Sequence, residues 1–120
     1  MRSIVIADDH ADIRHLLRVM LGQTYVLHEA EDGATALALV KLHQPDIVLL
    51  DVMMPGGMDG LQVLQAIKSD PATCTIKVAM VSARGQVADA DAAQQLGASA
   101  YFVKPFSPLH VVEWVRKQLG

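Results

Sequence analysis

Short apolar runs alternate with longer segments of helical period along the chain. The apolar runs are rich in Val and Ile, and the strands that they predict cover residues 3–7, 25–29, 46–50, 76–81 and 99–103. Within each run the apolar residues are mostly contiguous rather than alternating, which is typical of parallel strands covered on both faces. The pattern therefore predicts a parallel sheet that is buried from two sides.

Between these runs apolar residues recur at spacings of three and four, which indicates amphipathic helices. In the first interval the recurring residues are Ile13, Leu16, Leu17, Met20 and Leu21. Further helices are expected over 33–43, from residue 59 onward, over 86–96, and from residue 107 to the C-terminus. The residues that mark the helix bounds are of types that commonly begin or end helices, namely Gly22, Pro45, Asp59, Gly97 and Pro108.

The order of these elements predicts the class of fold. Strand and helix alternate from one end of the chain to the other, which favours a single α/β domain over residues 1–120. We expect a parallel sheet with right-handed crossovers and helices on both faces, although periodicity leaves the strand order open. In folds of this type ligands bind beyond the carboxyl ends of the strands, so the chemistry is expected at that edge.

Composition narrows the classes of protein that the chain can represent. The chain has 120 residues, of which 52% are hydrophobic, and a net charge of −3 that argues against direct binding of nucleic acid. No apolar stretch approaches the ~20 residues of a membrane-spanning helix. Cys74 is the only cysteine, which excludes an internal disulfide and is typical of a reducing compartment. We therefore expect a soluble, cytoplasmic protein without membrane insertion.

Polar side chains follow several of the predicted strands at the point where each strand ends. They are Asp8, Asp9, Asp51, Ser82 and Lys104. The carboxyl ends of parallel strands lie on one side of a sheet, so three carboxylates would share a crevice with one hydroxyl and one ammonium. Like charges ~4 Å apart repel by ~4 kcal/mol at an effective dielectric constant of 20, so the acids need a cation. Hard oxygen ligands suit Mg²⁺ or Mn²⁺.

Each of these residues also has a purely structural interpretation. Asp8 or Asp9 could cap the first helix, Asp51 could be a turn residue, Ser82 a buried hydroxyl with a partner, and Lys104 a solvated surface lysine. Chance explains their joint placement at four strand ends poorly.

The five histidines show no spacing typical of a metal site, and we interpret them as mostly surface residues.

Six segments, in this order, resemble the receiver (response-regulator, CheY-like) domains of two-component signalling. They are residues 4–9 (IVIADD), 45–51 (PDIVLLD), 54–55 (MP), 58–60 (MDG), 81–83 (VSA) and 97–106 (GASAYFVKPF). The resemblance covers the whole chain and implies a flavodoxin-like, doubly wound αβα fold with five strands in the order 2-1-3-4-5 and five helices.

The resemblance also implies roles for the residues at the sheet edge. Asp51 would accept a phosphoryl group from a phosphohistidine of a sensor histidine kinase or a histidine phosphotransfer protein. Asp9 would bind Mg²⁺ directly together with Asp51, Asp8 would act through water, and the backbone carbonyl of Met53 would be a further ligand. The domain would thus be regulatory, assisting only its own phosphorylation and dephosphorylation.

The resemblance further implies which residues would bind the phosphoryl group and which would transmit the signal. The Ser82 hydroxyl would bind the phosphoryl group, Lys104 would pair with it, and the Lys104–Pro105 peptide would be cis. Tyr101 would rotate inward on phosphorylation and remodel the surface formed by helix 86–96, strand 99–103 and the last helix. That surface would control a partner, an output domain or a homodimer. Trp114 either covers its neighbours on the last helix or anchors a partner there.

Two other functions and one departure from the family pattern remain open. A Mg²⁺-dependent phosphohydrolase of the haloacid-dehalogenase type would need an acid at the position of Met53. An unphosphorylated interaction module would not need the five polar residues. Between Pro55 and Met58 stand Gly56 and Gly57, one residue more than in most receivers. A glycine pair can adopt a positive φ and bulge without strain, and we expect a looser, wider loop over the phosphorylation site that leaves the chemistry intact.

Overall fold

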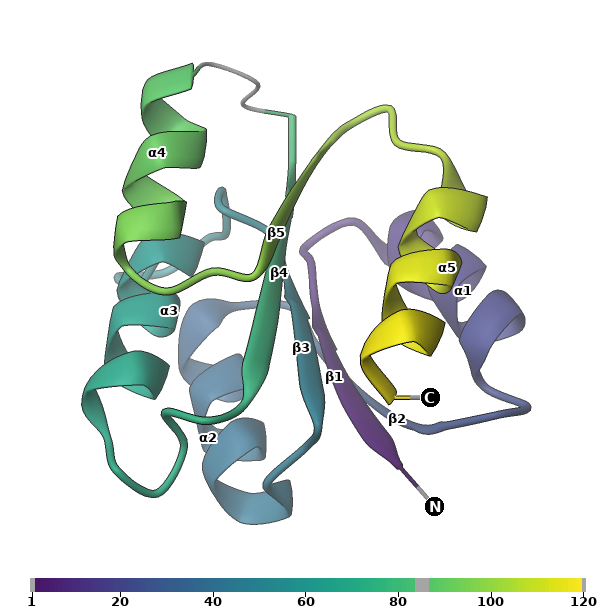
Figure 1. Ribbon diagram of the computed structural model, residues 1–120, viewed down its shortest axis with the longest axis horizontal. Coiled ribbons are helices and arrows are strands. Elements are labelled where there is room, and N and C mark those ends of the chain that lie inside the picture. Colours follow the sequence, from purple (N-terminus) through teal and green to yellow (C-terminus); the bar gives the residue numbers. More distant parts are fainter. Residues whose placement is uncertain (1, 84–86, 120) are drawn as a thin grey trace.

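The computed structural model describes residues 2–83 and 87–119, with the side chains of 87–89 excepted. Strands and helices alternate along the chain (Figure 1). The strands are β1 (Ser3–Ala7), β2 (Val26–Ala30), β3 (Ile47–Leu50), β4 (Lys77–Ser82) and β5 (Ala100–Val103). The helices are α1 (Ala11–Leu21), α2 (Gly33–His43), α3 (Gly60–Ser69), α4 (Val87–Gln95) and α5 (Pro108–Leu119). Gln86, where the fourth helix was predicted to begin, and Gly120 lie outside the described residues.

All strand pairs in the sheet are parallel, and the strand order is β2-β1-β3-β4-β5. The predicted α/β class and the order 2-1-3-4-5 are therefore confirmed. Predicted and observed strands differ by a single residue at some ends. The second strand, for example, begins at Val26 rather than Tyr25, because the Tyr25 N–H donates to the Leu21 carbonyl and so still belongs to the turn after α1.

The sheet separates two apolar cores, as the contiguous apolar runs predict. Along β1, Ile4 and Ile6 face the core that is shared with α1 and α5, whereas Val5 and Ala7 face the core that is shared with α2 and α3. Figure 1 shows α1 and α5 on one side of the sheet and α2, α3 and α4 on the other. β3 is buried along its full length, whereas β2 and β5 at the sheet edges are only partly buried.

Side-chain caps fix the helices that approach the carboxyl edge of the sheet. The Thr35 N–H donates to the Asp32 carboxylate at the start of α2 over 2.7 Å. At the start of α3, the Gln62 N–H donates to Asp59 and the Gln62 side chain accepts from the Asp59 N–H, both over 2.9 Å. This capping box confirms that Asp59 begins the third helix, and it satisfies N–H groups that a helix end leaves free.

Among residues 2–83 and 87–119, no helix is long and apolar enough to cross a membrane.

Candidate functional site

The register of the sheet brings the polar residues of four strands to one edge. Ala7 pairs with Leu50, and the Asp51 N–H donates to the Ala7 carbonyl over 2.9 Å, which places Asp51 beside Asp8. Farther along the same edge, where β4 and β5 end, the Lys104 N–H donates to the Ser82 carbonyl over 2.7 Å. The strand ends thus meet as the parallel sheet predicts.

An ammonium group joins the two buried carboxylates. The Lys104 Nζ lies 2.7 Å from Asp8 Oδ2 and 3.0 Å from Asp51 Oδ2. Each carboxylate side chain is only 3% exposed, and the lysine side chain is 13% exposed. Because buried charges need a partner of opposite sign, this lysine offsets the repulsion between the two acids.

The second oxygen of Asp51 is held by the backbone. The Met53 N–H donates to Asp51 Oδ1 over 3.2 Å, while Lys104 donates to Oδ2. Both carboxylate oxygens are therefore oriented, one by its own loop and one by the residue that follows β5. The Lys104–Pro105 peptide that follows is cis.

Burial and neighbouring charges shift the pKa values of Asp51 and Lys104. Burial raises the pKa of the Asp51 carboxyl and the neighbouring Asp8 adds to the rise, which outweighs the opposing hydrogen bond from Lys104. Burial lowers the pKa of the Lys104 ammonium, but hydrogen bonds to Asp8 and Asp51 outweigh it and the net pKa is raised. Lys104 is therefore a cation at neutral pH.

His10, in the loop after β1, and Arg14, on α1, contact the site in ways that the sequence did not reveal. The His10 Nδ1 lies 3.0 Å from Asp8 Oδ1 and 3.2 Å from Asp9 Oδ1. Arg14, on the first turn of α1, donates from Nη1 to the Asp8 carbonyl over 2.6 Å and pairs with Glu29. The His10 side chain is 60% exposed, as expected for a surface histidine, but it also contacts Asp8 and Asp9. Its only signal in the sequence is that it follows Asp9 directly.

The donor set at this edge fits a divalent cation. Asp8, Asp9, His10 and Asp51 each offer one ligand atom, and these atoms all lie within 4.8 Å of one another. Carboxylate oxygens in such a cluster are the ligands that Mg²⁺ and Mn²⁺ prefer. The Asp9 side chain is 35% exposed, so an ion has access to it from solvent.

The two residues expected to transmit a signal lie on β4 and β5. Ser82 is the last residue of β4 and is fully buried. Tyr101 lies on β5, pairs with Met80 across the strands and packs partly buried against the core next to α2 and α3. Trp114 on α5 is partly buried and meets Phe102 edge to face, with 6.2 Å between ring centroids. Trp114 thus covers its neighbours, and its role at an interface stays a prediction.

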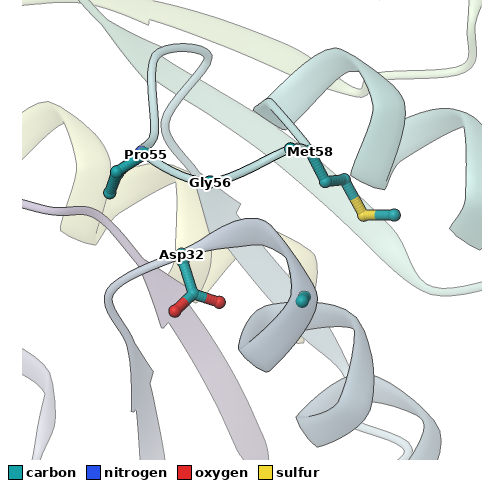
Figure 2. A pocket seen from close by; sticks show the side chains of 6 residues that line it. Asp32, Pro55, Gly56 and Met58 are labelled. Carbon is teal, nitrogen blue, oxygen red and sulfur yellow. The ribbon is translucent and has the colours of Figure 1, made fainter.

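The glycine pair lies in the loop between β3 and α3. Gly56 has a φ of +90°, a conformation that glycine adopts without strain. A groove of about 540 Å³ lies beside it, lined by Asp32, Ala34, Pro55, Gly56, Gly57 and Met58. Figure 2 shows the segment from Pro55 to Met58 passing over the start of α2, where Asp32 lies.

A second hollow, of about 430 Å³, lies closer to the acids. Its lining residues are Asp9, Met53, Met54, Pro55 and Asp59. None of the acid cluster is among the lining residues of the 540 Å³ groove, whereas Asp9 of that cluster lines this second hollow. How the additional glycine affects the chemistry of the site stays a prediction.

An acid cluster with a lysine at the carboxyl edge of a 2-1-3-4-5 sheet is the arrangement expected of a receiver domain. The chain matches the family model of the response regulator receiver domain over residues 4–116. It therefore belongs to the response regulator receiver family, the regulatory domains of two-component systems. Receiver domains generally bind Mg²⁺ in an acidic pocket, and this chain has such a cluster of aspartates.

Several known proteins are similar to this chain. The transcriptional regulatory protein ResD of Bacillus subtilis is 41% identical over 118 residues, which cover 98% of this chain and 48% of ResD. The phosphate regulon transcriptional regulatory protein PhoB of Escherichia coli is 36% identical over 116 residues, which cover 96% of this chain and 50% of PhoB. The chain thus spans about half the length of these two relatives.

Solved structures agree with the observed fold. A putative response regulator from Chloroflexus aurantiacus superimposes with a TM-score of 0.89 at 30% identity, covering 98% of this chain and 97% of the other. The chemotaxis response regulator CheY4 of Vibrio cholerae gives a TM-score of 0.89 at 24% identity, with 98% of each chain covered. The second likeness concerns the fold alone.

Proposed function

We propose that Asp51 accepts a phosphoryl group from a phosphohistidine carried by a sensor histidine kinase or a histidine phosphotransfer protein. The observation that carries this proposal is the buried carboxylate of Asp51, whose two oxygens are held by Lys104 and by the Met53 N–H. Phosphoryl transfer depends on positioning and on cations where negative charge collects, and this site provides both.

In the transfer, a carboxylate oxygen of Asp51 attacks phosphorus in line while the bond from phosphorus to the donor imidazole breaks. The donor leaves as an imidazole that has taken up a proton. Lys104, 3.0 Å from Asp51 Oδ2, pairs with one phosphoryl oxygen, and the Ser82 hydroxyl binds another. The product is an acyl phosphate, which hydrolyses readily and suits a transient signal.

Mg²⁺, when bound, would neutralise the phosphoryl oxygens, and Mn²⁺ could replace it. We assign Asp9, Asp51 and the backbone carbonyl of Met53 as its ligands, with Asp8 acting through water. The closeness of the carboxylate oxygens supports this assignment. The domain assists only its own phosphorylation and dephosphorylation.

The test is phosphorylation by a small phosphodonor such as acetyl phosphate in the presence of Mg²⁺. Intact-mass analysis is expected to show one acid-labile phosphoryl group on the wild-type chain and none on Asp51→Asn. An identical adduct on the Asp51→Asn variant, or no adduct on the wild-type chain, would contradict the proposal.

We further propose that phosphorylation is transmitted through α4, β5 and α5. Ser82 would turn toward the phosphoryl group and Tyr101 would move inward, which changes the surface offered to a partner, an output domain or a second copy. Support comes from β5, an edge strand whose Val103 is 45% exposed.

Association after phosphorylation can be measured by analytical ultracentrifugation. Trp114→Ala is expected to weaken it, whereas Leu42→Ala, at an exposed position on α2 and outside this surface, is the control. Trp114 packs against Phe102, so thermal unfolding of each variant must show that the fold is retained. Association that is unchanged in Trp114→Ala would contradict a role in the interface.

A further inference from the structure

His10 stands directly before α1, at a position where a side chain often caps the helix. The residue has extended backbone angles there, but its side chain makes no capping hydrogen bond. Its imidazole contacts the acid pair instead, with Nδ1 within 3.2 Å of Asp8 and Asp9. The proposed phosphoryl transfer gives this imidazole no role.

The distances around His10 match those between ligands of one metal ion. In an octahedral shell with bonds of about 2.1 Å, neighbouring ligand atoms lie about 3.0 Å apart and opposite ones about 4.2 Å apart. The His10 Nδ1 lies 3.2 Å from Asp9 Oδ1, close to the spacing of neighbouring ligands. The four ligand atoms of the cluster lie within 4.8 Å of one another, so the outermost of them must move inward to share one ion. A single ion could therefore contact the imidazole and the Asp9 carboxylate together.

The contacts of Asp8 indicate which residues are available to that ion. Its Oδ2 is bound by Lys104 and its Oδ1 receives the backbone N–H of His10 over 2.8 Å. Asp9 and His10 are the more exposed members of the cluster, with side chains 35% and 60% exposed. An ion arriving from solvent thus meets Asp9 and the imidazole first.

We propose that His10 Nδ1 is a direct ligand of the divalent cation held by Asp9 and Asp51, and that it makes the site favour transition-metal ions over Mg²⁺. The proposal rests on the metal site of the proposed function. Imidazole is a good ligand for Co²⁺, Ni²⁺ and Zn²⁺, whereas Mg²⁺ prefers oxygen, so one nitrogen among oxygens shifts the preference.

The experiment compares Co²⁺ and Mg²⁺ binding to the whole chain by isothermal titration calorimetry. His10→Ala is expected to weaken Co²⁺ binding by about tenfold or more, while Mg²⁺ affinity stays within about twofold of wild type. His15→Ala, at an exposed position of α1, is the matched control and should change neither. In the Co²⁺-loaded wild type, proton NMR should show shifted imidazole resonances that His10→Ala lacks.

Two outcomes would overturn the proposed role of His10 without contradicting the proposed function. Tighter binding of both ions by His10→Ala would show that the imidazole is a hydrogen-bonded competitor of the metal. Equal weakening of both ions would show that it only positions the carboxylates. Absence of Mg²⁺ binding and of acetyl phosphate labelling in the wild type would instead contradict the proposed function itself.

Discussion

At the scale of single residues, Lys104 contacts both buried acids of the site. Replacing it with Met leaves two buried carboxylates without their cation. In EDTA, we expect Lys104→Met to lower the free energy of unfolding by about 3 kcal/mol, measured by urea denaturation.

Lys77→Met is the control for this prediction. Lys77 is exposed on β4, where its Nζ lies 2.7 Å from Gln118 Oε1, so its loss should cost less than about 0.5 kcal/mol. Equal losses in the two variants would show that the buried contact contributes nothing particular.

Arg14 acts on the site through the backbone of the acid pair. Its guanidinium contacts the Asp8 carbonyl and Glu29 together, and its side chain is only 11% exposed. Lys cannot reproduce this forked contact. Arg14→Lys is therefore expected to weaken Mg²⁺ binding about tenfold in calorimetric titrations, as loss of a residue that orients metal ligands does.

Arg18→Lys provides the comparison, since Arg18 lies on the same helix and pairs with the same Glu29. If both variants lose the same affinity, the effect comes from Glu29 and the helix rather than from the Asp8 carbonyl.

The sequence revealed the residues that follow strands but not the contacts that depend on side-chain direction. Asp8, Asp51 and Lys104 could be placed together because parallel strands end at one edge. The contacts of His10 and Arg14 depend on how the loop after β1 turns into α1, and on rotamers that no periodicity encodes.

At the scale of elements, the junction between β3 and α3 requires a glycine at position 60. A Cβ there would lie 1.9 Å from the Asp51 carbonyl oxygen, and the contact is with backbone that cannot simply move aside. Gly60→Ala should therefore destabilise the fold by about 3 kcal/mol in urea denaturation, and it should also disturb phosphorylation of Asp51.

Gly57→Ala is a matched test in the same loop, because no atom of residues 2–83 and 87–119 lies within 4 Å of a Cβ there. It is expected to change stability by less than about 0.5 kcal/mol. A large effect at position 57 would show that the loss at position 60 does not come from the nearby Asp51 carbonyl, and a small effect at position 60 would refute the steric argument.

The bounds of the helices were predicted better than the burial of the edge strands. Asp59 and Pro108 are types of residue that begin helices, and α3 and α5 begin at or just after them. The sequence of β5 is as apolar as that of the central strands, yet Val103 is exposed, because a strand at an edge has a neighbour on one side only. Strand position in the sheet is set by tertiary packing, not by local pattern.

At the scale of the whole molecule, a stacked histidine pair links stability to pH. The rings of His28 on β2 and His43 at the end of α2 lie 3.7 Å apart. Burial, and then the charge of His43, lower the pKa of His28 below its ordinary value of 6.5. The unfolded chain thus binds a proton more readily at this residue, and the stability from this source falls as pH drops below about 6.5.

His28→Gln tests this linkage. Between pH 7.5 and pH 5 the wild type should lose more thermal stability than the variant, because the variant lacks the group whose protonation favours unfolding. Parallel melting curves for the two proteins across this range would contradict the prediction.

The class of the molecule followed from the alternation of strands and helices, but the order of the strands did not. Periodicity fixes which residues face a core, whereas the order 2-1-3-4-5 entered through resemblance to receiver domains and agrees with the observed sheet. The single-domain organisation expected for residues 1–120 stays a prediction.

The contact between Lys104 and Asp8 has a consequence for synthesis of the protein. It joins residues 96 positions apart, so the chain must close a long loop before the contact can form. A growing chain contains Asp8 and Asp51 before it contains Lys104, which can neutralise them only after β5 has joined the sheet. A chain that does not yet contain Lys104 therefore lacks the ammonium that neutralises Asp8 and Asp51.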